Sequence, residues 1–77
     1  MGRRINESVI KKIVKRQLEL SYNAAEKDVV SALTNAILDN SEQAVTKSIV
    51  QVLNSKYPGS DLISLTSRRI FAEVYTD

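Results

Sequence analysis

The residues of this chain best suited to chemistry are four cations close together near its start, and the chemistry that they suit is the binding of anions. On a helix of about 3.6 residues per turn they would occupy about one third of the circumference. Cations gathered on one surface can neutralise phosphates or meet the carboxylates of an acidic protein. The same pattern is typical of the solvated face of an amphipathic helix. This basic cluster consists of Lys11, Lys12, Lys15 and Arg16, and Arg3 and Arg4 precede it.

The charge of the chain is unevenly distributed. The formal net charge of the 77 residues is +2, but residues 1–22 carry +4, residues 23–46 carry −3 and residues 47–77 carry +1. A basic first segment favours a nucleic acid or an acidic protein as partner. A membrane-surface helix would favour Trp or Phe anchors, which the first segment lacks, and no aromatic residue interleaves the cations to stack on single-stranded bases.

Catalytic and metal-binding patterns are missing from the sequence. There is no histidine to act as a base of near-neutral pKa, and no cysteine. The only two glycines, Gly2 and Gly59, form no phosphate-binding loop. The carboxylates fit neither an EF-hand nor a paired-acid spacing. We therefore expect a protein that is not an enzyme and that uses no metal and no cofactor.

The length of the chain predicts one domain, residues 1–77, that gains stability by self-association. A chain of this size buries only about 60% of its unfolded surface, and without cysteine or histidine neither a disulfide nor a typical zinc site can staple it. A homodimer is the remaining route to extra burial. No run approaches the roughly 20 apolar residues of a membrane span, and the first residues do not resemble a signal peptide. We expect a cytoplasmic protein that does not enter the membrane.

Apolar periodicity predicts an all-α fold, a small three- to four-helix bundle arranged as an intertwined or coiled-coil-like homodimer. Asn6 or Ser8 can cap the first helix, in which Val9 and Leu20 belong to the apolar half and only Gln17 interrupts that half. A strand competes over residues 45–53, which are rich in β-branched side chains, but their spacing favours a helix. After a basic arm at residues 1–5, the helices are expected at about 7–21, 24–39, 42–57 and 61–75.

The second of these helices is the segment around which the others are expected to pack. Asn23 can cap it with Glu26 in a capping box, and Asn40 with Gln43 can do the same for the third helix. Tyr57 and the Pro-Gly pair after it end the third helix. The residues expected in the core or at the dimer interface are Val29, Leu33, Ala36, Ile37, Ile49, Val52, Leu53, Ile70 and Val74.

A helix-turn-helix is a further possibility, because several short helices follow one another. The turn at residues 39–41 lacks glycine, and the third helix offers few groups for base edges beyond Lys47, Gln51 and Asn54. The basic cluster is the better candidate for contact with double-stranded DNA.

Three segments resemble a known family when taken in order. They are Ala32-Leu33-Thr34-Asn35-Ala36-Ile37-Leu38, Lys47-Ser48-Ile49-Val50 and Ser60-Asp61-Leu62-Ile63, and the chain ends on Val74-Tyr75-Thr76-Asp77. This order is similar to that of the YmgB/AriR family of small enterobacterial biofilm and acid-resistance regulators. The resemblance covers roughly residues 26–77.

The resemblance implies an all-helical, dimeric regulator. Members of the family are described as connectors that act on the Rcs phosphorelay and as regulators associated with DNA. For this chain it implies contact with a response-regulator protein, in the control of biofilm formation and acid resistance. The alternative is a small dimeric transcriptional regulator that binds double-stranded DNA through the basic first helix.

Overall fold

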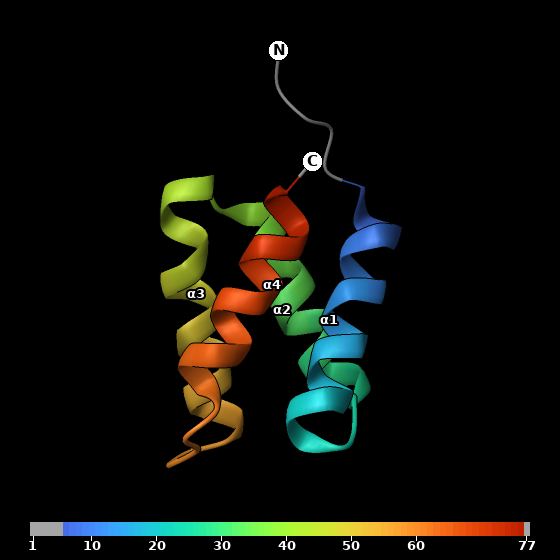
Figure 1. The fold of residues 1–77 in the computed structure, drawn as a ribbon. Helices are drawn as coiled ribbons and strands as arrows, with labels where there is room; N and C mark the ends of the chain where they lie inside the picture. The colour runs from blue at the N-terminus through green and yellow to red at the C-terminus, as the bar shows by residue number, and fades with distance from the viewer. Residues whose placement is uncertain (1–5, 77) are drawn as a thin grey trace.

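Four helices make up the described part of the chain, and consecutive helices run in opposite directions (Figure 1). A computed structural model describes residues 6–76. Over these residues the predicted all-α bundle of three to four helices is confirmed, with four helices, and the segment that could have been a strand is helical. Residues 1–5, the predicted basic arm, lie outside the described part. The helices are α1 (Glu7–Tyr22), α2 (Lys27–Asp39), α3 (Glu42–Lys56) and α4 (Ile63–Tyr75).

The helices form a closed ring around one core. Each helix packs against two neighbours, α1 against α2 and α4, and α3 against α2 and α4. The seam between α1 and α4 closes the ring, and both helices reach the same end of the bundle, where the described chain begins and ends (Figure 1). The bundle measures 38 × 21 × 19 Å between its Cα atoms. The core consists of Ile10, Ile13, Val14, Leu18, Val29, Val30, Leu33, Ile37, Val45, Ile49, Leu53, Ile63, Ile70 and Val74.

Asparagine side chains and backbone fix both ends of α1. The Asn6 Oδ1 accepts hydrogen bonds from the backbone N–H groups of Ser8 and Val9, at 2.8 and 3.3 Å, so Asn6 is the N-cap. Asn23 ends the helix in the left-handed conformation, with φ of 63°, and its N–H donates to the Glu19 carbonyl at 2.9 Å. Asparagine tolerates this conformation better than most residues do, so the chain turns here.

The role of Asn23 corrects the predicted start of α2. The sequence suggested that Asn23 caps a helix starting near Ala24, but α2 begins at Lys27 and its N-cap is Glu26, whose side chain makes no capping hydrogen bond. Because Asn23 is used to end α1, the three residues after it connect the helices. The same Asn23 cannot both end α1 and cap the start of α2.

The other helix ends differ from the prediction in a similar way. Asn40 does not cap α3; its Nδ2 donates to the Ala36 carbonyl at 2.7 Å at the end of α2, and Ser41 is the N-cap of α3. The chain after α3 turns through Gly59, with φ of 81°, a conformation that favours glycine. The Ser60 Oγ accepts from the Leu62 N–H at 3.0 Å, and α4 starts only at Ile63.

Most of the residues expected in the core or at a dimer interface are buried inside a single chain. Ala36 and Val52 are only half-buried, in a groove between α2 and α3 that Ser48 also lines. Seven of the nine therefore belong to the core of one bundle and are covered without a second copy. These seven are Val29, Leu33, Ile37, Ile49, Leu53, Ile70 and Val74.

The apolar half of the first helix was assigned too broadly. Val9 is 51% exposed and Leu20 is 64% exposed, whereas Gln17 is buried with 4% exposure. In a ring of four helices only a narrow strip of each helix faces the core, and Gln17 lies on that strip of α1. Val9 and Leu20 lie beside it, on the surface.

Two aromatic rings hold the end of the bundle that is opposite to the termini. Tyr22 and Tyr57 stack with ring centroids 3.8 Å apart and an interplanar angle of 5°. The Tyr22 hydroxyl also forms a hydrogen bond of 2.9 Å with the Ser60 Oγ. These contacts join the C-terminal ends of α1 and α3 to the turn before α4, and so hold the C-terminal end of α1 in place.

Candidate interaction surface

The bundle divides the basic cluster between two sides of α1. Lys11 and Lys15 line a groove of about 380 Å³ between α1 and α2, together with Lys27 from the first turn of α2. Ala25 and Val30 give this groove apolar walls, and Ser31 adds a hydroxyl. The structure thus brings three lysines from two helices together around one groove. We call it the lysine groove.

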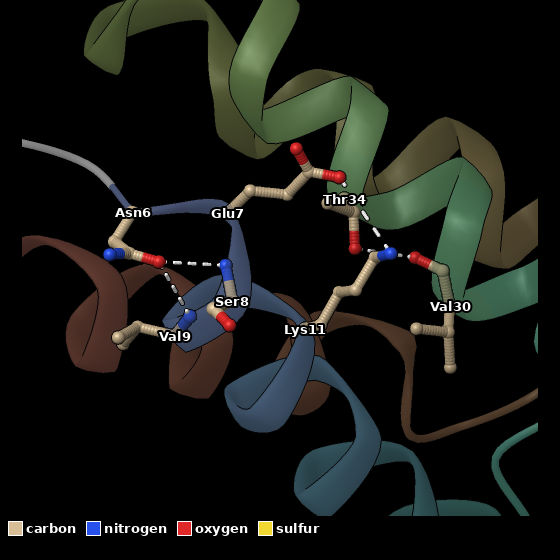
Figure 2. Close-up of polar contacts among 7 residues, drawn as sticks. All are labelled: Asn6, Glu7, Ser8, Val9, Lys11, Val30 and Thr34. Atoms are coloured by element: carbon tan, nitrogen blue, oxygen red, sulfur yellow. Dashed lines mark hydrogen bonds and ion pairs between the residues drawn. The ribbon is translucent and has the colours of Figure 1, made fainter.

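Lys11 extends from α1 toward α2. Its Nζ lies 3.7 Å from the Glu7 Oε2, one helical turn earlier, and both side chains remain at least half exposed. Figure 2 shows the ammonium group of Lys11 beside the carboxylate of Glu7 and near Thr34. The Thr34 hydroxyl donates to the Val30 carbonyl at 2.7 Å, so it already has an acceptor. An exposed pair of this kind is weak and easily exchanged for another anion.

Lys27 was not among the residues predicted for the site. Its place beside the first helix follows from the antiparallel α1–α2 hairpin, whose short connection brings the start of α2 against the last turns of α1. A lysine at a helix N-terminus adds its charge to the positive end of the helix dipole, so the groove favours an anion there.

Asp28, the residue that follows Lys27, pairs with a lysine of another helix. The Lys56 Nζ of α3 donates to the Asp28 Oδ2 at 3.3 Å. This hydrogen bond from Lys56 holds the pKa of Asp28 below its ordinary value. Asp28 is therefore drawn toward α3, on the other side of α2 from the lysine groove.

Arg16 is separated from the lysines by its partner. Its Nη2 donates to both carboxylate oxygens of Glu73 on α4, at 2.8 and 2.9 Å. The side chain of Arg16 thus lies on the α4 side of α1, away from the groove. Arg16 was predicted to share one surface with Lys11 and Lys15, and the structure does not bring them together.

The remaining predicted cations lie elsewhere. Lys12 is exposed on the outer side of α1 and does not line the groove. Arg3 and Arg4 lie outside the described residues. Residues 6–40, which include α1 and α2, hold five basic and five acidic side chains, so this half of the bundle is neutral as a whole. The lysine groove is a local concentration of positive charge, not part of a basic molecule.

Between residues 6 and 76, no three His, Cys, Asp or Glu side chains gather where they could hold a metal ion. None of the four helices in this range combines the length and the hydropathy of a membrane span.

Comparison with protein-family models, with curated proteins and with solved structures finds no match for this chain. The resemblance to the YmgB/AriR family is neither supported nor denied by these comparisons, and it stays a prediction. The surfaces of the bundle are therefore the features that bear on function.

Proposed function

We propose that this chain is a non-enzymatic regulatory protein that acts as a homodimer and binds an acidic surface of a partner protein through the lysine groove. The observation that carries the proposal is the gathering of Lys11, Lys15 and Lys27 from two helices around one groove with apolar walls. Ammonium groups at the edge of an apolar groove suit a protein surface that combines carboxylates with small apolar side chains.

The shape of the bundle favours a protein partner over the bases of DNA. The major groove is about 12 Å wide and admits one helix. Here α1 is flanked by α2 and α4 in a bundle 21 × 19 Å across, which is wider than the major groove. The neutral charge of residues 6–40 also gives little general attraction to phosphates.

The resemblance in sequence supplies the class of partner. It implies a response regulator of the Rcs phosphorelay, with biofilm formation and acid resistance as the processes controlled. On this proposal the chain is a cytoplasmic connector that changes the activity of the response regulator by occupying one of its acidic surfaces.

The homodimer is supported by the small size of the core and by large apolar side chains left on the surface, among them Val9 and Leu20. A light-scattering mass at micromolar concentration should be twice the 8.6 kDa of one chain. A mass equal to that of one chain would remove the dimer from the proposal.

The binding test uses two variants that remove the same charge. Lys15→Gln/Lys27→Gln empties the lysine groove of two charges and leaves Lys11 with Glu7. Lys12→Gln/Lys47→Gln removes two exposed lysines outside the groove. The probes are a purified response regulator of the Rcs phosphorelay and a DNA duplex, each titrated at low and at high salt.

The groove variant should weaken binding of the response regulator by about 2- to 30-fold, the equivalent of two exposed charge pairs, and less at high salt. The control should bind as the unmodified chain does. Equal weakening by both variants would contradict the role of the groove. Tight DNA binding whose salt slope falls by about 0.9 per lysine removed would instead favour the DNA-binding alternative.

A further inference from the structure

Large apolar side chains gather on one side of the bundle, where α1 and α4 meet. Five such side chains are exposed between residues 6 and 76, and only Leu38 belongs to α2. The other four belong to α1 or to the start of α4. They are Val9, Leu20, Leu62 and Leu65.

The position of Arg16 shows which way the two residues of α1 point. Val9 precedes Arg16 by seven residues and Leu20 follows it by four, so the three lie along one strip of the helix. Arg16 contacts Glu73 of α4. Val9 and Leu20 are therefore on the α4 side of α1, opposite to the lysine groove.

The contact between Arg16 and Glu73 also shows which side of α4 faces α1. A groove of about 340 Å³ lies between the two helices, lined by Ile13, Arg16, Ala72, Glu73 and Thr76. Leu65 precedes Ala72 by seven residues and shares its strip of α4. Leu62 lies next to the start of α4. We name this surface the α1/α4 face, and define it by Val9, Leu20, Leu65 and Ala72.

We propose that a second copy of this chain packs against the α1/α4 face. The proposal rests on the homodimer put forward above and names its interface. The α1/α4 face extends about 24 Å along the 16 residues of α1, at about 1.5 Å per residue, and about 20 Å across the bundle, so its projected area is about 500 Å². This area is toward the small end of what specific interfaces bury on each partner.

The α1/α4 face is suited to a copy of itself. A two-fold axis through the groove at Ala72 brings the Val9 end of one chain onto the Leu20 and Leu65 end of the other, so apolar side chains meet at both ends. At the centre, Arg16 and Glu73 already pair at 2.8 Å and can pair with the same residues of the copy. The small side chain of Ala72 lets the two faces approach closely.

Another groove of the bundle suits a second copy less well. It lies between α2 and α3 and is lined by Ala32, Ala36, Ser48, Gln51, Val52, Ser55 and Lys56. None of the large exposed apolar side chains of the described residues lines it. Packing at the α1/α4 face also leaves the lysine groove of each chain open, because that groove is on the opposite side of α1.

The charges on the α1/α4 face give the dimer a salt dependence of its own. Basic side chains on the outer sides of the two helices outnumber the acidic ones. They are Lys12, Arg16, Arg68 and Arg69 against Glu19 and Glu73. The Arg16–Glu73 pairs compensate one another, so the remaining net positive charge of one face repels that of the other, and salt screens this repulsion. Self-association should therefore tighten as salt rises, whereas binding of an acidic partner in the lysine groove should weaken.

The experiment is sedimentation equilibrium of the full chain over a dilution series, at roughly 0.05 M and 0.5 M salt. Leu20→Glu places a charge on the α1/α4 face, and Leu38→Glu places the same charge on an exposed leucine of α2. Leu20→Glu should raise the dissociation constant of the dimer by about tenfold or more. Leu38→Glu should leave it within about twofold. Circular dichroism verifies that both variants keep their helices.

A cysteine variant tests the same face without destabilising it. Because the chain has no cysteine, Ala72→Cys introduces a single thiol at the centre of the face, and Leu38→Cys introduces one elsewhere. A short thiol crosslinker should join two chains of Ala72→Cys and leave Leu38→Cys unlinked. A monomeric unmodified chain overturns both the dimer and this interface. A dimer that Leu20→Glu and Leu38→Glu weaken equally, with no preference in crosslinking, overturns the interface alone.

Discussion

Leu33 should contribute more to the stability of the bundle than any exposed leucine on the same helix. It has no exposed surface and lies on the strip of α2 that also carries Val29 and Ile37. Leu33→Ala removes three carbon atoms from the core. At about 0.8 kcal/mol for each, the loss of burial alone is about 2.4 kcal/mol, and the cavity left behind raises the expected range to about 2–5 kcal/mol.

The matched control is Leu38→Ala, five residues later on α2. Leu38 is 41% exposed, so its truncation removes less buried surface and leaves no closed cavity. We expect a loss of about 1 kcal/mol. A chain of 77 residues has a free energy of unfolding of roughly 4–12 kcal/mol, so the Leu33 variant should lose a large fraction of it and the Leu38 variant should not.

The assay is urea unfolding followed by circular dichroism at one fixed protein concentration, because a dimer makes stability depend on concentration. In both variants the slope of the unfolding free energy against urea concentration, the m-value, should stay the same, and only the midpoint should shift. A loss below about 1 kcal/mol for Leu33→Ala, or a loss no larger than that of Leu38→Ala, would refute the assignment of α2 to the centre of the core.

Three further changes should have effects of known sign. Gln17→Leu should raise the free energy of unfolding by about 1 kcal/mol, because the Gln17 Oε1 is buried without a hydrogen-bond donor among the described residues. Asn23→Ala should lower it by about 1 kcal/mol, and Asn23→Gly should not, because φ is 63° at this position. Burial, followed by the charge of Glu26, raises the pKa of Tyr57 above 10.0. The unfolded chain therefore loses this proton first, and stability should fall as pH rises past about 10, less so in Tyr57→Phe.

These three effects are measured by urea unfolding and can each fail separately. Gln17→Glu, which buries a charge instead of removing an acceptor, should lower stability, and a gain for both variants of Gln17 would contradict the reasoning. Equal effects of alanine and glycine at Asn23 would mean that the left-handed conformation costs nothing. The same alkaline loss in Tyr57→Phe as in the unmodified chain would assign it to other groups.

The periodicity of apolar residues predicted the helices and most of the core. Val29, Leu33 and Ile37 recur at intervals of four, which place them on one side of α2 whatever the neighbouring helices do. Helix ends were harder to predict, because Asn23 and Asn40 suit either the start of one helix or the end of another. Asn23 ends α1 and Asn40 binds the last turn of α2, and the local sequence does not distinguish these roles.

The candidate surfaces could be predicted only in part, because they depend on how helices pair. The sequence showed cations on one half of the first helix, but a bundle with two neighbours gives that helix two flanks. Lys15 lies on the α2 side with Lys27, and Arg16 on the α4 side with Glu73. Lys15 and Arg16 are thus adjacent in the sequence but lie on different surfaces of the bundle. Neither Lys27 nor Glu73 is close to them in the chain, so no local pattern could associate them.

This separation means that the two surfaces of α1 can be tested independently. Changes at sites without shared partners have additive effects on free energy, within about 0.5 kcal/mol. The combined variant Lys15→Gln/Lys27→Gln/Leu20→Glu should therefore lose as much affinity for the partner as the groove variant does, and its dimer should have the dissociation constant of Leu20→Glu. Partner binding is titrated with a monomeric response regulator, so that avidity does not contribute to the measured affinity. Sedimentation equilibrium and the titration measure the two constants separately. If the groove variant alone changed the dimer constant by tenfold, the groove would be part of the dimer interface, and the division of α1 into two surfaces would be wrong.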